Sequence, residues 1–252
     1  LQNIIANISL KALSKDSVNL GIKRLSLDEK MSGFSLKKMS LKLVANNKQT
    51  SIDNFAIELP ETSLKMDTIH LVYDSLQAFG HFAEKVHFSF RTLPSQITLK
   101  DISPFVPVLS HFKEPITLDM EVKGTVDQLN CSHLEIVSEE QQFRLRGDVS
   151  LQDLSHPQDA YVYGTLSELS ANTRGVGFLV RNLNPDYNGV PPVLERLGNI
   201  SFRGEISGYF TDLVTYGQLR TSLGDVKTDL KLSADKSKGL FAYSGAVKTT
   251  DK

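Results

Sequence analysis

Six histidines are the residues of this chain best suited to hold a metal ion, but their spacing argues against that chemistry. They are His70, His81, His87, His111, His133 and His156. A metal site needs ligands that converge on one point, as two histidines do in an HExxH helix. No two of the six have that spacing, and the closest pair, His81 and His87, would not share a face well enough to chelate an ion. We therefore expect no metal site and no cofactor.

Residues for nucleophilic or acid–base catalysis are equally hard to assemble. Cys131, the single cysteine, lies between Asn130 and Ser132 without a cation nearby, so we interpret it as an inert thiol. The GxSxG motif of serine hydrolases is absent, and "RGVGFL" at 174–179 lacks the Lys-Ser or Lys-Thr of a phosphate loop. Adjacent Glu139 and Glu140 would face opposite ways on a strand and fit a solvated turn better. The sequence predicts a protein that is not an enzyme.

Composition narrows the remaining classes. The 252 residues are 40% hydrophobic and 23% charged, with a net charge of −1 and no tryptophan. A nucleic-acid partner usually requires a basic face, so we expect none. No apolar run approaches the roughly 20 residues of a membrane-spanning helix, and no signal peptide is visible. Because the chain opens and closes inside strand-like phrases, we expect it to be cut from something longer, with any anchor or export signal outside it.

The residues from 116 to 151 set the fold class, because apolar side chains occupy every second position there. Such alternation gives a strand one apolar and one polar face, and the phrases end in Gly, Asp or Asn, which favour turns. Ten apolar residues of this stretch and of the similar phrase at 200–210 are the candidates to line an apolar groove: Ile116, Leu118, Met120, Val122, Leu134, Ile136, Phe143, Leu145, Ile200 and Phe202. We expect an all-β fold of antiparallel amphipathic strands in an elongated, curled sheet or trough.

The same alternation recurs over most of the chain, and helix signals are few. Strand-like phrases cover 7–13, 22–27, 34–44, 50–59, 63–73, 85–93, 161–166, 200–210, 216–235 and 239–250. Short helices are predicted within 75–85, 101–113 and 191–199, the last started by two prolines and ended by Gly198. The stretch 170–190 breaks the alternation and is interpreted as a long connection or an irregular layer. We predict one elongated β segment over 1–252, with a possible seam near 92–103.

Several phrases, taken in order, resemble a known family. They are "IKRLSLDEK", "SGFSLKKMSLKL", "LKDISPFVPVL", "LDMEVKGTVDQLNCSHLEI", "LGNISFRGEISG" and "GQLRTSLGDVKTDLKL". This ordered set resembles the TamB-like proteins of the translocation and assembly module, which belong with the AsmA-like envelope proteins of Gram-negative bacteria. The resemblance covers essentially the whole chain as an internal segment of a longer protein.

The resemblance implies a location, partners and a role. Such proteins are anchored in the inner membrane by an N-terminal helix, extend across the periplasm and form a long β-trough with an apolar inner surface. They are linked to phospholipid transport towards the outer membrane and to assembly of outer-membrane proteins, for which an outer-membrane assembly barrel would be the partner. The family has no catalytic residues to carry over. This chain lacks both the N-terminal anchor and the family's C-terminal domain, so any membrane contact would be made by parts outside it.

Two arrangements would hide the apolar face of so many strands. In the first, the face lines an open trough that receives phospholipid acyl chains, because aliphatic and aromatic side chains make no directional demands on a lipid tail. In the second, two sheets close into a sandwich, and the chain is an adhesion or binding module that recognises glycan or protein through loops. Arg181 and Tyr187 in the 170–190 stretch are the candidates for that second role.

Overall fold

The structure is a computed structural model that describes residues 1–104, 107–156, 159–183, 192–209, 212–235 and 240–249. Strands account for 65% of it and helices for 14%, and the strands pair antiparallel. This confirms the all-β fold class with a few short helices. Packing divides the chain into two compact units, Leu1–Thr125 and Val126–Lys252. The region 92–103, where a seam was predicted, lies inside the first unit.

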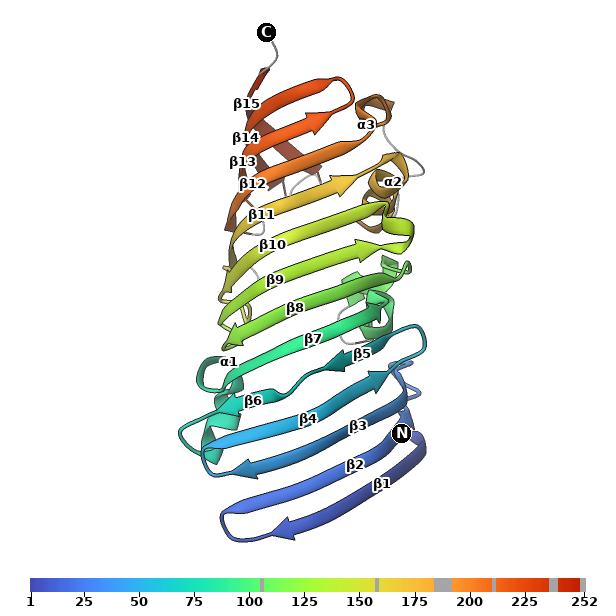
Figure 1. Ribbon diagram of the computed structural model, residues 1–252, viewed down its shortest axis with the longest axis vertical. Coiled ribbons are helices and arrows are strands. Elements are labelled where there is room, and N and C mark those ends of the chain that lie inside the picture. Colours follow the sequence, from blue (N-terminus) through green and yellow to red (C-terminus); the bar gives the residue numbers. More distant parts are fainter. Residues whose placement is uncertain (105–106, 157–158, 184–191, 210–211, 236–239, 250–252) are drawn as a thin grey trace. The chain divides into compact units, whose positions relative to one another are not determined.

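The first unit is an antiparallel sheet whose strands follow chain order (Figure 1). Its strands are β1 (Gln2–Leu13), β2 (Ser17–Asp28), β3 (Ser35–Asn46), β4 (Gln49–Glu58), β5 (Ser63–Met66), β6 (Ile69–Val72), β7 (His87–Ile97) and β8 (Ile116–Gly124). The short strands β5 and β6 both lie between β4 and β7. The helical turns of the unit are η1 (Leu76–His81), α1 (Phe82–Lys85), η2 (Leu99–Ile102) and η3 (Pro107–His111).

The second unit is also an antiparallel sheet in chain order. Its strands are β9 (Gln128–Ser138), β10 (Phe143–Gln152), β11 (Tyr161–Ala171), β12 (Ile200–Tyr209), β13 (Asp212–Thr221), β14 (Gly224–Asp235) and β15 (Leu240–Thr249). Its helical elements are η4 (Glu139–Gln141), α2 (Thr173–Leu183) and α3 (Pro192–Leu197). In Figure 1 the helices α2 and α3 lie beside the ends of strands β10 to β12.

Most local predictions agree with these elements. The phrase 75–85 forms η1 and α1, and α3 begins at Pro192 and is followed by Gly198, whose φ of 63° is the left-handed conformation of a helix C-terminus. The 101–113 region, where a short helix was predicted, overlaps two short 3₁₀ turns, η2 and η3, the second of which begins at Pro107. Glu139 and Glu140 are exposed in the turn η4, as predicted.

The prediction of a long connection over 170–190 is wrong for its first half. Strand β11 runs to Ala171, and helix α2 starts two residues later. The Asn172 side-chain oxygen accepts a hydrogen bond from the Gly175 backbone N–H at 2.9 Å, which is the arrangement of a helix N-cap. Val176 and Phe178 are then buried at 5% and 7% exposure. Residues 184–190 lie outside the described residues.

Candidate functional site

Antiparallel pairing aligns the apolar residues of the first unit into rows that run across its strands. One row joins Leu10, Leu20, Leu43, Ile52 and Ile69, each directly opposite the next on β1, β2, β3, β4 and β6. Because alternate residues of a strand share a face, neighbouring rows fall on the same side of the sheet. We call this side, defined by the row above, the first apolar face.

A second row on the first apolar face shows that apolar residues remain opposite one another on the far side of the register shifts. It joins Ala6, Leu25, Met39, Ile57 and Leu64 on β1 to β5. Each of the pairs β1–β2, β2–β3 and β3–β4 has one register shift between the two rows, at Asn7/Ile8, Ile22/Leu25 and Ser40/Lys42. A bulge adds a residue to one strand, so beyond it the apolar residues would point to the opposite side of the sheet unless their spacing also changed. The sequence does change, because the apolar spacing in β2 lengthens from two to three residues between Ile22 and Leu25.

The second unit carries a longer row. Six successive strands, β9 to β14, each contribute one residue, and each residue stands directly opposite the next: Ile136, Leu145, Leu169, Phe202, Leu219 and Val226. Another row joins Leu129, Leu151, Val162, Gly208, Leu213 and Leu232. We call the side that carries these rows the second apolar face. Its side chains on β9 to β13 are mostly half-buried, neither sealed nor fully exposed.

Glycines on the second apolar face make room for the largest side chain of the row. A Cβ placed on Gly204 or Gly217 would lie 2.8 or 2.7 Å from ring atoms of Phe202. The phenyl ring therefore lies against the backbone of two neighbouring strands, where only glycine leaves space for it. Aromatic rings commonly cover strand glycines in this way, and here the ring keeps the face apolar where side chains are missing.

The ten candidate groove residues are distributed over both apolar faces. Eight of them are half-buried and two are buried. Ile136, Leu145 and Phe202 lie together in the long row of the second unit, and Leu134 and Ile200 are half-buried on flanking positions of β9 and β12. In the first unit, Ile116, Leu118 and Met120 are half-buried on β8. The two buried residues are Val122 and Phe143, with only 2% and 5% of their surface exposed.

Leu43, Leu169, Leu219 and the other members of the rows are not among the candidates predicted from the sequence. Leu43 and Leu219 belong to phrases with the same alternation as the stretch from 116 to 151, and Leu169 lies three residues beyond the phrase 161–166. What the alternation does not give is the register, which decides which apolar residues stand opposite one another.

Each apolar face is covered by other elements only in places. In the second unit, α2 packs Phe178 against Phe143, with ring centroids 5.9 Å apart. In the first unit, the segment 74–86, which we call the strap, contributes Ala78 and Val86 to a small buried cluster with Tyr73. Within each unit the described strands belong to one sheet. Neither unit therefore has a second sheet, among its described residues, to close over its apolar face.

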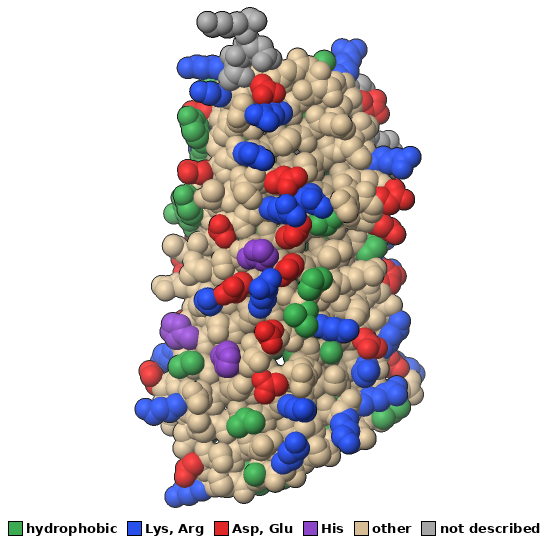
Figure 2. All heavy atoms as spheres, viewed as in Figure 1, with side chains coloured by type: hydrophobic (Ala, Val, Ile, Leu, Met, Phe, Trp, Pro, Cys, Tyr) green, Lys and Arg blue, Asp and Glu red, His purple; other side chains and the backbone are tan. Residues whose placement is uncertain are grey.

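The opposite side of each sheet is mostly polar and carries charges of both signs, with a few exposed apolar or aromatic side chains such as Val44 and Val214. In the second unit Arg146 on β10 contacts Glu135 on β9 at 2.7 Å and Glu168 on β11 at 3.6 Å. In the first unit Lys38 and Glu58, opposite each other on β3 and β4, are 3.7 Å apart. Figure 2 shows a face on which basic and acidic side chains are interspersed and hydrophobic ones are fewer. Such a surface is suited to water rather than to a single charged partner.

The described residues form neither a metal site nor a site with an activated nucleophile. These residues contain no group of three or more His, Cys, Asp or Glu side chains placed to hold a metal ion. Cys131 is buried on β9, and burial raises the pKa of its thiol to about 11, helped by the nearby Asp148 carboxylate. The side chain of Arg181 and the whole of Tyr187, the loop candidates, lie outside the described residues.

The buried thiol of Cys131 gives a simple test of the sheet in the second unit. A raised thiol pKa keeps Cys131 protonated until the pH approaches 11, and the thiolate is the reactive form. At pH 8 we expect iodoacetamide to label the folded chain at least about tenfold more slowly than the urea-unfolded chain. Mass spectrometry of timed samples measures both rates. Equal rates would mean that β9 and β10 do not enclose Cys131 as described.

The fold and its surfaces define a class: an all-β protein with antiparallel sheets, each apolar on one side and charged on the other. None of the helices in the described part of the chain has both the length and the apolar character that a membrane crossing requires. Comparison with protein-family models, curated proteins and solved structures gives no match for this chain.

Proposed function

We propose that this chain is a non-enzymatic segment of a TamB-like envelope protein whose apolar faces bind phospholipid acyl chains. In this proposal it lies in the periplasm of a Gram-negative bacterium, as part of a protein anchored in the inner membrane through segments outside this chain. It supports phospholipid transport between the inner and outer membranes, assembly of outer-membrane proteins with a barrel partner, or both. The ordered family phrases and the apolar faces together motivate the proposal.

The observation that carries the proposal is the row of six apolar residues on β9 to β14. Strands in a sheet are about 4.8 Å apart, so such a row extends over roughly 24 Å. That length is comparable with an extended acyl chain. Each methylene removed from water contributes about 0.8 kcal/mol, so a chain lying along the row needs no polar anchor to bind.

The alternative function, adhesion through loops, lacks a comparable observation. It requires two sheets packed face to face, whereas the described strands of each unit belong to a single sheet. Its loop candidates lie outside the described residues. We therefore propose lipid binding alone.

Lipid that purifies with the chain tests the proposal directly. We expect native mass spectrometry of the chain, expressed in a Gram-negative host with export to the periplasm, to show adducts of phospholipid mass. Organic extraction of the same sample should identify the lipid class and give at least one lipid per chain. A chain that is folded by circular dichroism but carries no lipid, and takes up none from phospholipid vesicles, would contradict the proposal.

A further inference from the structure

The strap, residues 74–86 between β6 and β7, is held by its own backbone hydrogen bonds and packs on the sheet of the first unit. The backbone N–H of Ala78 donates to the Ser75 carbonyl at 3.0 Å, and that of Val86 donates to the Phe82 carbonyl at 3.2 Å. Ala78 and Val86 are 5% and 0% exposed, so they fix the strap to the sheet. Most of its other side chains lie at the surface.

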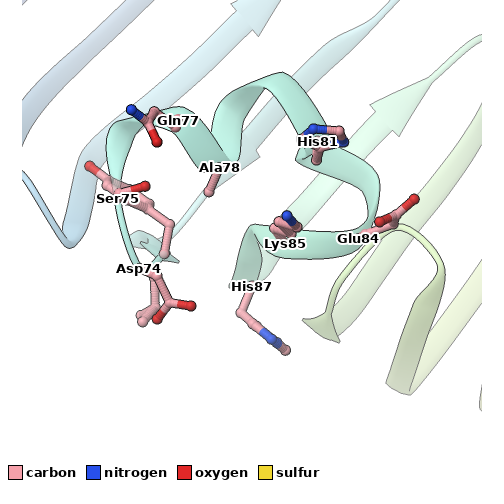
Figure 3. Close-up of a pocket in the computed structure, with 10 residues that line it drawn as sticks. Asp74, Ser75, Gln77, Ala78, His81, Glu84, Lys85 and His87 are labelled. Atoms are coloured by element: carbon pink, nitrogen blue, oxygen red, sulfur yellow. The ribbon is translucent and has the colours of Figure 1, made fainter.

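The strap surrounds a cavity of about 580 Å³ at the ends of β6 and β7. A volume of roughly 300–1,000 Å³ is typical of small-molecule sites. Figure 3 shows Asp74 and Ser75 where the chain enters the strap, and Lys85 and His87 where it leaves. The segment thus brings residues from both ends of the loop to one opening.

The lining of this cavity is charged with both signs, and the charges do not neutralise one another by contact. Asp74 and Glu84 supply two carboxylates, Lys85 supplies an ammonium group, and His81 and His87 supply two imidazoles. Among the described residues, none of these five side chains makes a hydrogen bond or an ion pair. The opening therefore presents acceptors for a cation and donors for an anion at the same time. That combination matches a zwitterion better than a simple anion or cation.

The same strap also reaches the first apolar face through a file of aromatic rings. Ring centroids are 6.1 Å apart for Phe79 and Phe82, 6.3 Å for Phe82 and Phe88, and 6.1 Å for Phe88 and Phe90. Phe88 and Phe90 stand opposite Leu71 and Val122 in the sheet. Phe79 and Phe82 on the strap are 40% and 39% exposed. A ligand at the strap would thus meet a polar cavity and exposed aromatic surface on one short segment.

We propose that the strap cavity binds the headgroup of a zwitterionic phospholipid, such as phosphatidylethanolamine. Lys85 contacts the phosphate, since Lys is a common phosphate ligand. Asp74 and Glu84 contact the ammonium group, and Phe79 and Phe82 contact the first methylenes of the acyl chains. This inference deepens the proposed function and rests on it, because it assigns a lipid class and an entry point to the apolar face. The shared chemistry, a phosphate joined to an ammonium group, also occurs in soluble headgroup compounds, and the test separates the two sources.

Isothermal titration calorimetry of the full chain with three probes tests the assignment. The probes are dihexanoyl-phosphatidylethanolamine, dihexanoyl-phosphatidylglycerol and chain-free glycerophosphoethanolamine, each kept below any micelle concentration. We expect the first to bind most tightly. Lys85→Glu should weaken its binding about tenfold or more, the effect of losing one charge-assisted contact. Asp74→Asn with Glu84→Gln should weaken phosphatidylethanolamine and leave phosphatidylglycerol unchanged. Lys30→Glu, in the β2–β3 turn, is the matched control and should change nothing.

Each contrary result has a distinct meaning. Unchanged phosphatidylethanolamine binding in both cavity variants, or equal binding of phosphatidylglycerol to the native chain, would overturn the headgroup site. Equal binding of glycerophosphoethanolamine would assign the cavity to a soluble zwitterion and overturn the lipid assignment. If the cavity variants bind normally while variants of the apolar faces lose lipid, this inference fails and the proposed function stands. If the chain carries no lipid and takes up none from phospholipid vesicles, yet binds dihexanoyl-phosphatidylethanolamine through Lys85, the acyl-chain faces of the proposed function fail and the headgroup site stands.

Discussion

Leu43→Asp is expected to remove most of the phospholipid bound to the first unit, whereas Val44→Asp is expected to leave it in place. The two residues are neighbours on β3 and point to opposite sides of the sheet. Leu43 lies in a row of the first apolar face between Leu20 and Ile52, and Val44 is 47% exposed opposite Asn19 and Ser51. Both substitutions replace an aliphatic side chain with the same carboxylate.

The physical reason for the difference is desolvation. A carboxylate on the apolar face must lose water when an acyl chain lies over it, and an unpaired buried charge costs several kcal/mol. We therefore expect Leu43→Asp to lower the affinity of the first apolar face for an acyl chain at least about tenfold, which corresponds to about 1.4 kcal/mol or more, so that the variant keeps only the lipid held by the second unit. On the other side of the sheet, the carboxylate of Val44→Asp stays in water. Quantitative lipid extraction, normalised to protein that is folded by circular dichroism, measures both.

A second matched pair repeats the test in the second unit. Leu219 belongs to the six-residue row, and Val214 on the same strand, β13, stands opposite Ser207 and Lys231 and is 38% exposed. Leu219→Asp should reduce bound lipid and Val214→Asp should not. Equal lipid content in the two members of either pair, with both proteins folded, would show that the apolar face of that unit is not where lipid binds. Val122 is unsuitable for such a test, because it is 2% exposed and its replacement would test folding.

Phe143→Ala is expected to lower the free energy of unfolding of the second unit by about 3–5 kcal/mol, the usual range for a buried phenylalanine. Phe143 is 5% exposed and stacks on Phe178 of α2 at 5.9 Å. Its removal leaves a cavity under the helix and deprives Phe178 of its ring partner. The effect on lipid should be secondary, since the Phe143 side chain is already covered.

Urea unfolding followed by circular dichroism measures this loss. Tyr163→Ala is the control, because it deletes a ring of similar size from β11 of the same unit where the side chain is 47% exposed. We expect the control to change stability by less than about 1 kcal/mol, as surface substitutions usually do. If Phe143→Ala proves as mild as the control, α2 does not pack on the sheet as described.

Local chemistry in the sequence was sufficient for the strands, the turns and most short helices. Period-two alternation states which residues share a face of a strand, and it does so without knowledge of any neighbour. Pro192 and Gly198 bracket α3 because one fits a first helical turn and the other adopts positive φ. The exposed turn at Glu139 and Glu140 followed from the same local argument.

Other features depended on partners distant in the chain, so only the tertiary structure decided them. Helix α2 was missed because its two glycines weaken helix propensity, while the contact that stabilises it joins Phe178 to Phe143, 35 residues earlier. Phe143 and Leu145 look alike in the sequence, yet α2 covers the first and leaves the second half-buried in its row. The rows and the strap cavity arise in the same way. The sequence by itself determined which side chains are apolar and alternate, and register and packing decided which of them meet, which are covered and which remain open to a ligand.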